Sequence, residues 1–369
     1  MTKIIHTADL HLKEFGDERW QALEELLELT KDQQATALTI SGDLFDAPAS
    51  AQALRDKIRP LFSQQPFQII IIPGNHDLGA FSAGEYYGEN TKIFLHSATT
   101  TNQTTNTLQL NNKTTIAAIP FAKLSQEQLL ATLSQFQQTL NPDHHNLLLI
   151  HGELTDLFFD SADFGEEGSK RYLPFSLEML ATTPFDYILA GHFHSKFHLK
   201  KINNKRLKDG GFFIYPGSPT SITTKEIGSR SAALVEVGKT PQQLTLNTRH
   251  YELVELPLTP DSDQSFLQDA QKILQQLPKK ATGILKVSGY FNQETLKLSE
   301  QELHQQLQQL TQDNQALLKD EDFTAKDIGQ VFSSSLYQKM IKKIEQAAAN
   351  DQEKETLLKT TLIEALTQS

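Results

Sequence analysis

Two histidines, His192 and His194, follow an apolar run at residues 187–190 that is typical of a buried strand. Gly191 marks the turn at which this strand ends. Side chains at i and i+2 of an extended chain point to the same side, so both imidazoles can face one site. Because imidazole is a common metal ligand, the pair is a candidate for metal binding, although two histidines alone are weak evidence.

Four further motifs also stand at the ends of short apolar runs: Asp-x-His, Gly-Asp, Gly-Asn-His-Asp and His-Gly. In an α/β sheet, ligands bind outside the carboxyl ends of the strands, so motifs that are distant in sequence can converge there. The predicted metal ligands are two carboxylates, one amide and four imidazoles, namely Asp9, His11, Asp43, Asn75, His151, His192 and His194.

Seven ligands are too many for one ordinary site and fit two metal ions that share one carboxylate. Mixed oxygen and imidazole donors suit manganese, iron or zinc better than calcium. Two cations about 3.5–4 Å apart can clamp the attacking and leaving oxygens of a phosphoester and activate a bridging water. The motifs therefore predict phosphoester hydrolysis. His76 is the predicted catalytic residue, a hydrogen-bond donor or general acid toward the leaving oxygen, and Asp77 is its candidate orienting partner.

A purely structural reading is the alternative for each motif, because a single Asp or His is more often a turn residue or a core histidine. Five motifs in this order, each after a buried strand, make coincidence a poor explanation. The remaining histidines lie in a strand, in polar loops or far from the motifs, and we expect none to be a ligand: His6, His144, His145, His198, His250 and His304.

Strands and helices alternate in the N-terminal part of the chain, which predicts an α/β fold with a parallel sheet. Strands are expected at 3–6, 37–40, 67–72, 147–150, 187–190, 212–215 and 232–237, with helices from 17, at 50–62 and at 125–140. Ser125 and Gln128 form a candidate capping box. Residues 155–174 are expected to form a long loop.

The pattern changes near residue 250, where a smaller α+β unit is expected, including one helix at 294–311. Amphipathic helices at 334–349 and 351–367 can pack on their own domain or dock on a partner. The predicted domains are 1–249, a catalytic domain; 250–320, a small α+β domain; and 321–369, a C-terminal helical pair.

The composition is acidic, with a formal net charge of −11 over 369 residues. Tight, unaided DNA binding is not expected of such a chain, so a nucleic-acid substrate requires a local basic patch or a partner. No apolar run approaches the roughly 18 residues that span a bilayer, and the N-terminus lacks a signal-peptide layout. Cysteine is absent, which excludes disulfides and thiolate metal sites. We expect a cytoplasmic protein with no membrane partner.

The ordered motifs over residues 1–240 resemble the calcineurin-like metallophosphoesterase superfamily, whose core is a β-sandwich flanked by helices. Thr-Ala-Asp-Leu-His-Leu at 7–12, Gly-Asp-Leu-Phe-Asp at 42–46 and Tyr-Pro-Gly-Ser-Pro at 215–219 are similar to the SbcD family of bacterial DNA repair nucleases. Archaeal members carry histidine where this chain has Asp46, whereas bacterial members often carry aspartate.

The resemblance implies a manganese-dependent DNA exonuclease and endonuclease in double-strand break repair. It implies two metal ions, one held by Asp9, His11, Asp43 and His194 and the other by Asp43, Asn75, His151 and His192, with His76 on the scissile phosphate. It also implies a homodimer, a capping domain at 250–320 and a helical pair within 321–369 that docks an SbcC-like SMC-type ATPase.

The sequence is also compatible with two other functions. A phosphodiesterase that acts on nucleotides or other small phosphodiesters would use the same ligands, although such enzymes commonly need only the core domain. A phosphoesterase that has lost activity and serves as a scaffold would usually lack ligands, and none is missing from this sequence.

Overall fold

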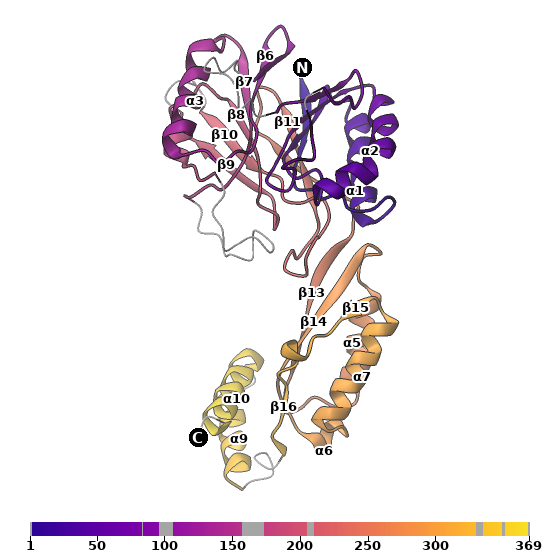
Figure 1. Cartoon of the computed structure of the whole chain (residues 1–369). Coiled ribbons are helices and arrows are strands. Elements are labelled where there is room, and N and C mark those ends of the chain that lie inside the picture. The colour runs from indigo at the N-terminus through magenta and orange to yellow at the C-terminus, as the bar shows by residue number, and fades with distance from the viewer. Residues whose placement is uncertain are drawn as a thin grey trace. The chain divides into compact units, whose positions relative to one another are not determined.

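The computed structural model describes residues 2–82, 84–95, 106–156, 173–204, 210–329, 335–348 and 351–367 (Figure 1). The chain divides into two compact units, Met1–Tyr251 and Glu252–Ser369. Most of the loop expected at 155–174 lies outside the described residues. Among the helices in these ranges, none has both the length and the apolar character needed to cross a membrane.

The first sheet of unit 1 contains the predicted series of alternating strands and helices. In spatial order, the strands are β12 (Gln242–Thr245), β11 (Ser231–Glu236), β1 (Lys3–Thr7), β2 (Ala37–Ser41), β3 (Gln68–Ile72) and β4 (Thr91–Ile93). β1, β2, β3 and β4 run parallel, whereas β11 pairs antiparallel with β1, and β12 pairs antiparallel with β11.

The second sheet of unit 1 has the same number of strands. Its central strands β6, β7, β8 and β10 are parallel, and the antiparallel strands β5 and β9 form its two edges. In spatial order, the strands are β5 (Thr107–Asn111), β6 (Thr114–Ile119), β7 (His145–His151), β8 (Tyr187–Gly191), β10 (Gly211–Tyr215) and β9 (His198–Ile202).

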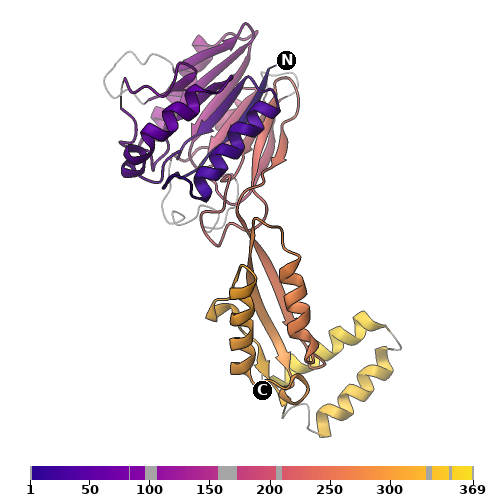
Figure 2. The ribbon, with the colours of Figure 1, turned by 90° about the vertical axis from the view of Figure 1, so that its right-hand side faces the viewer.

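Helices cover the outer faces of both sheets (Figure 1), and the two on the first sheet face the viewer in Figure 2. α1 (Glu18–Asp32) and α2 (Pro48–Ser63) pack on the first sheet, whereas α3 (Gln126–Thr139) and α4 (Leu177–Ala181) pack on the second. The inner faces share one core that contains Ile4, Ile70, Leu147 and Leu189, and each such fully buried side chain contributes roughly 1.5–3 kcal/mol. Unit 1 is therefore the expected β-sandwich flanked by helices, and the predicted capping box at Ser125 and Gln128 is present.

Polar side chains also join the two sheets near the ends of their strands. His6 of β1 contacts the hydroxyl of Thr39 through Nδ1 (3.2 Å) and donates from Nε2 to the carbonyl of Ala190 in β8 (3.2 Å). Ser41 of β2 donates its hydroxyl to the carbonyl of Leu189 (2.8 Å). These bonds hold the carboxyl ends of β1, β2 and β8 together.

Complete burial lowers the pKa of His6 from 6.5 to about 3, against the opposing effect of its hydrogen bonds. Below pH 6.5 the imidazole of His6 binds a proton in the unfolded chain but stays neutral in the folded chain. The folded state therefore loses stability as the pH falls below 6.5. In EDTA, we expect the unfolding free energy of the wild type to fall more steeply than that of His6→Gln, by about 1.4 kcal/mol per pH unit. Urea unfolding at a series of pH values tests this, and equal slopes would contradict the assigned burial.

Unit 2 combines a small sheet with several helices, and the two helices predicted at its C-terminal end are present. The single helix expected at 294–311 is wrong: Lys297 adopts a left-handed φ of 61°, and Ser299 begins a second helix with a capping box to Glu302. The elements are β13 (His250–Leu258), α5 (Ser265–Gln275), β14 (Ala281–Phe291), α6 (Gln293–Leu296), α7 (Glu300–Asp313), β15 (Ala316–Leu317), β16 (Lys326–Asp327), α9 (Ser335–Ala348) and α10 (Gln352–Thr367).

Candidate metal centre

The predicted ligands stand on loops that leave the carboxyl ends of β1, β2 and β3 in one sheet and of β7 and β8 in the other. The structure brings these loops together at one edge of the sandwich. The predicted ligand Asn75 and the predicted catalytic residue His76 are half-buried, whereas the other six predicted ligands are buried. The half-buried side is therefore the side from which a substrate can approach.

The loops after β1 and β2 run side by side. His11 N donates to the carbonyl of Asp43 (2.9 Å), and Asp9 N donates to the carbonyl of Gly42 (3.0 Å). Eight non-glycine residues of the described chain have a positive φ, and four of them are the predicted ligands Asp9, His11, Asp43 and His192. Each such conformation costs on the order of 1–3 kcal/mol and persists only where the surroundings impose it.

Two glycines make room for the polar side chains. A Cβ on Gly42, whose φ is 93°, would overlap the imidazole of His151, and a Cβ on Gly74 would overlap the carboxylate of Asp43. Glycine is therefore required at both positions for the loops to approach one another this closely.

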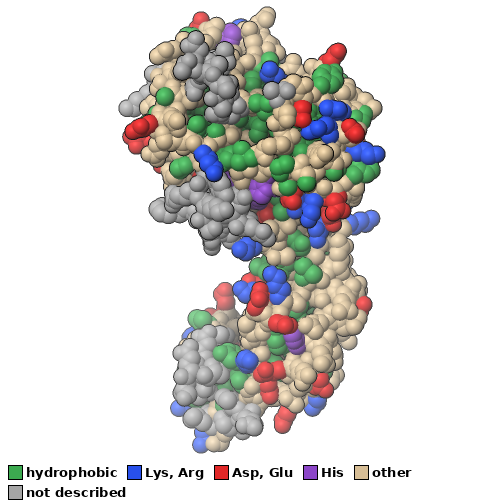
Figure 3. Space-filling model, in the orientation of Figure 1, with side chains coloured by type: hydrophobic (Ala, Val, Ile, Leu, Met, Phe, Trp, Pro, Cys, Tyr) green, Lys and Arg blue, Asp and Glu red, His purple; other side chains and the backbone are tan. Residues whose placement is uncertain are grey.

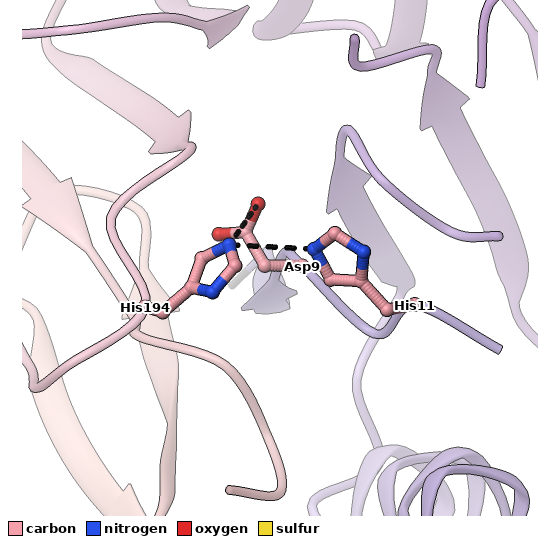
Figure 4. Close-up of side chains that lie close together, drawn as sticks. All are labelled: Asp9, His11 and His194. Carbon is pink, nitrogen blue, oxygen red and sulfur yellow. Dashed lines mark hydrogen bonds and ion pairs between the residues drawn. The ribbon is translucent and has the colours of Figure 1, made fainter. Parts of the chain in front are cut away.

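One group of donor atoms comprises Asp9, His11 and His194 (Figure 4). The Nε2 atoms of His11 and His194 face each other at 3.3 Å, and His194 Nε2 lies 4.0 Å from Asp9 Oδ1. Two nitrogen ligands at roughly 2.1 Å from one tetrahedral cation would stand about 3.4 Å apart. The spacing of these two nitrogens fits a shared metal ion.

A second group forms around His151. Its Nδ1–H donates to the carbonyl of Ser41 (2.8 Å), so Nε2 is the nitrogen left for a ligand role. That Nε2 lies 2.9 Å from Asn75 Oδ1 and 3.3 Å from Asp43 Oδ2. The ring of His192 packs edge-on against the ring of His151, with centroids 5.3 Å apart.

Asp43 lies between the two groups. Its Oδ1 accepts from His76 N (2.8 Å), whereas Oδ2 is buried and makes no hydrogen bond to the described residues. Oδ2 stands 3.8 Å from His11 Nε2 and 3.3 Å from His151 Nε2. A buried carboxylate oxygen placed between two sets of imidazole nitrogens fits a residue that bridges two cations.

Burial and the surrounding charges set the protonation of the histidines. Burial lowers the pKa of His11 and of His192 well below the ordinary value, so both are neutral and able to bind a cation. Burial would also lower the pKa of His151, but the carboxylates of Asp43 and Asp9 raise it to about 9. His151 therefore carries a proton at neutral pH when no metal is bound.

Manganese binding should release the proton of His151, because only the neutral imidazole is a ligand. We expect the affinity of the protein for Mn²⁺ to rise by up to about tenfold per pH unit as the pH increases toward the His151 pKa of about 9. Calorimetric titration with Mn²⁺ in buffers of different ionisation enthalpy measures the protons released. Binding without proton release near neutral pH would contradict this assignment.

The orienting contact to His76 comes from Asp46. His76 Nδ1 donates to the backbone oxygen of Asp46 (3.0 Å), and Arg19 joins the carboxylate of Asp46 (2.6 Å) to the carbonyl of His11 (2.6 Å). Asp77, the partner that the sequence suggested, instead accepts hydrogen bonds from the backbone of the β2 and β3 loops. These contacts give Asp77 a role in holding the two loops together.

Glu226, in the loop between β10 and β11, is a residue that the sequence motifs did not indicate. It is fully buried, and its Oε1 lies 3.5 Å from His194 Nδ1. Burial would raise the pKa of Glu226, but His194 and the backbone amide of Ile222 lower it to about 2. No sequence motif indicates this glutamate, because only the folded path of the loop brings it close to His194.

Residues 2–196 match the family model of the calcineurin-like phosphoesterases. Among curated proteins, the chain is similar to the SbcD subunit of nuclease SbcCD from Staphylococcus epidermidis, at 26% identity over 239 residues, which cover 58% of this chain and 61% of that protein. The match thus spans less than two thirds of the relative's length.

Two phosphatases are among the solved structures that are similar to this chain. A dimetal phosphatase from Danio rerio has 9% identity and a TM-score of 0.41, and the match covers 66% of this chain and 96% of that one. A purple acid phosphatase from yellow lupin (Lupinus luteus) seeds has 13% identity and a TM-score of 0.40, with 63% and 49% covered.

Proposed function

The chain belongs to the calcineurin-like phosphoesterase family, and on that premise we propose that it is a metal-dependent DNA nuclease. Membership makes it a hydrolase of phosphoester bonds that uses divalent metal ions. The observation that carries the proposal is the position of Asp43, whose buried Oδ2 lies between the imidazoles of His11 and His151.

We assign Asp9, His11, Asp43 and His194 to one cation and Asp43, Asn75, His151 and His192 to the other. When bound, two such cations lower the pKa of a water and neutralise charge that develops on the phosphate. Oxygen and imidazole donors together suit manganese, iron or zinc, and from the resemblance to the SbcD family we propose Mn²⁺ as the physiological ion.

His76 is the proposed catalytic residue. Its Nδ1–H is held by the backbone oxygen of Asp46, which leaves Nε2 to meet the substrate. From this position the imidazolium can donate a hydrogen bond to a phosphate oxygen and then a proton to the leaving 3′ or 5′ oxygen. Asp46 and Arg19 fix the loop that carries this contact.

DNA is the proposed substrate because the relative is called a nuclease and because this chain carries a second unit beyond the catalytic one. We extend the proposal to the repair of double-strand breaks, to a homodimer, to a cytoplasmic location and to an SbcC-like ATPase partner. The predicted capping domain at 250–320 and the docking of α9 and α10 on that ATPase belong to the same proposal.

The surface charge supports the need for a partner. On the face drawn in Figure 3, basic side chains lie among acidic ones, so the described residues of this face form no continuous basic strip. With a net charge of −11, we propose that DNA affinity comes largely from a second protein and from dimerisation.

Competition tests the choice of substrate. With Mn²⁺ present, linear duplex DNA should inhibit the hydrolysis of bis-p-nitrophenyl phosphate competitively, since both must occupy the same centre. Cyclic nucleotides and 2′-deoxymononucleotides should be poor competitors. If cyclic nucleotides compete and are hydrolysed while DNA does neither, the protein is a phosphodiesterase for small substrates instead.

A further inference from the structure

We propose that Glu226 is a positioning residue of the metal centre, whose carboxylate holds the His194 imidazole with Nε2 directed at a metal ion. This inference rests on the proposed function, because Glu226 acts through a predicted ligand. The residue lies outside the segment 2–196 that matches the family model, on the loop between β10 and β11.

The two nitrogens of His194 face different surroundings. Nε2 faces the centre, 3.3 Å from His11 Nε2 and 4.0 Å from Asp9 Oδ1 (Figure 4). Nδ1 is buried, makes no hydrogen bond within the described part of the chain and lies 3.5 Å from Glu226 Oε1. A movement of about 0.5 Å would bring this pair to ordinary hydrogen-bond distance.

The loop fixes the Glu226 carboxylate from several sides. Oε2 accepts from the hydroxyl of Ser218 (2.8 Å) and from Ile222 N (2.9 Å). Oε1 contacts the backbone N–H (3.3 Å) and the hydroxyl (3.2 Å) of Thr223, beside its approach to His194. A buried carboxylate held in this way cannot rotate, so its Oε1 stays next to the imidazole.

The same loop also holds the backbone of His194. Arg230, which is 2% exposed, donates from Nη2 to the carbonyl of His194 and from Nη1 to that of Ser195 (2.7 Å). Ser218 N donates to the His194 carbonyl as well (3.0 Å). One loop therefore constrains both the main chain and the imidazole of this predicted ligand.

A carboxylate that accepts Nδ1–H fixes the histidine tautomer and makes Nε2 a stronger ligand. Loss of such a contact typically lowers metal affinity by about 10–100-fold. Since His194 is assigned to only one of the two cations, removing the charge of Glu226 should weaken one site and spare the other.

The test is calorimetric titration of the full-length protein with Mn²⁺, without DNA, for the wild type, Glu226→Gln and Glu236→Gln. We expect Glu226→Gln to weaken one of the two manganese sites by about 10–100-fold and to leave the other unchanged. Glu236→Gln makes the same change at a carboxylate of β11 that pairs with Lys3 and Lys239, so both affinities should match those of the wild type.

Unchanged affinities in Glu226→Gln would overturn the inference. So would equal weakening of both sites together with a lower melting temperature in EDTA, because that pattern indicates a purely structural role. A wild-type protein that binds no manganese would overturn the proposed function itself, whereas two tight sites in both proteins would overturn only the role of Glu226.

Discussion

Replacing Asp43 by asparagine is expected to lower phosphodiester hydrolysis by about 1000-fold or more, because several kcal/mol of transition-state stabilisation depends on the bound cations. The amide can still accept the hydrogen bond from His76 N, but it cannot bridge two metal ions as an anion. The measurements are kcat/KM for bis-p-nitrophenyl phosphate in Mn²⁺ and the number of manganese ions bound per chain.

Asp186→Asn is the matched control for this change. Asp186 is a partly buried carboxylate of the same unit that pairs with His145 (3.1 Å) and accepts from Asn146 N (2.8 Å). Its variant should keep near-wild-type hydrolysis. Retention of two manganese ions and of most of the activity by Asp43→Asn would contradict the bridging role.

Replacing His76 by alanine should lower hydrolysis by about 10²–10⁴-fold while both manganese ions remain bound, since a general acid contributes on this scale. The backbone N–H of residue 76 still donates to Asp43 in this variant, so the bridging carboxylate keeps its orientation. The deficit should be smallest for substrates with a good leaving group, such as p-nitrophenolate, which needs little protonation.

His144→Ala serves as the control, because the ring of His144 contacts the hydroxyl of Thr115 (3.0 Å) and is not a predicted ligand. Loss of manganese from His76→Ala would show that His76 is a ligand instead. The measurement is needed because His76, His11 and Asp43 also present donor atoms within 4.8 Å of one another, as metal ligands would.

Much of the fold could be predicted because its signals are local. Buried strands such as β3 appear as uninterrupted apolar runs. The capping box involves only Ser125 and Gln128, which are close in sequence. The parallel order of β1 to β3 then requires the polar residues after each strand to meet at one edge. The break at Lys297 was missed, because apolar periodicity continues across it.

The contacts that orient His76 and His194 could not be predicted, because they join residues from separate loops that only the fold brings together. The oxygen that holds His76 belongs to the backbone of Asp46, and backbone groups have no residue-type signature. Glu226 reaches His194 from 32 positions away, through the loop that joins a strand of one sheet to a strand of the other. The positive φ of Asp9, His11 and Asp43 likewise follows from the pairing of two loops rather than from residue preference.

Incubation of end-labelled linear DNA with the full-length protein is the most direct test of the proposed two-metal nuclease. With Mn²⁺, the wild type should release labelled fragments, whereas the wild type in EDTA and Asp43→Asn in Mn²⁺ should leave the DNA intact. Hydrolysis of bis-p-nitrophenyl phosphate in the same tubes shows that the centre is active. DNA that stays intact even after an SbcC-like ATPase is added, beside rapid hydrolysis of the small ester, would contradict a nuclease function for this chain. Cleavage by Asp43→Asn would contradict the two-metal centre.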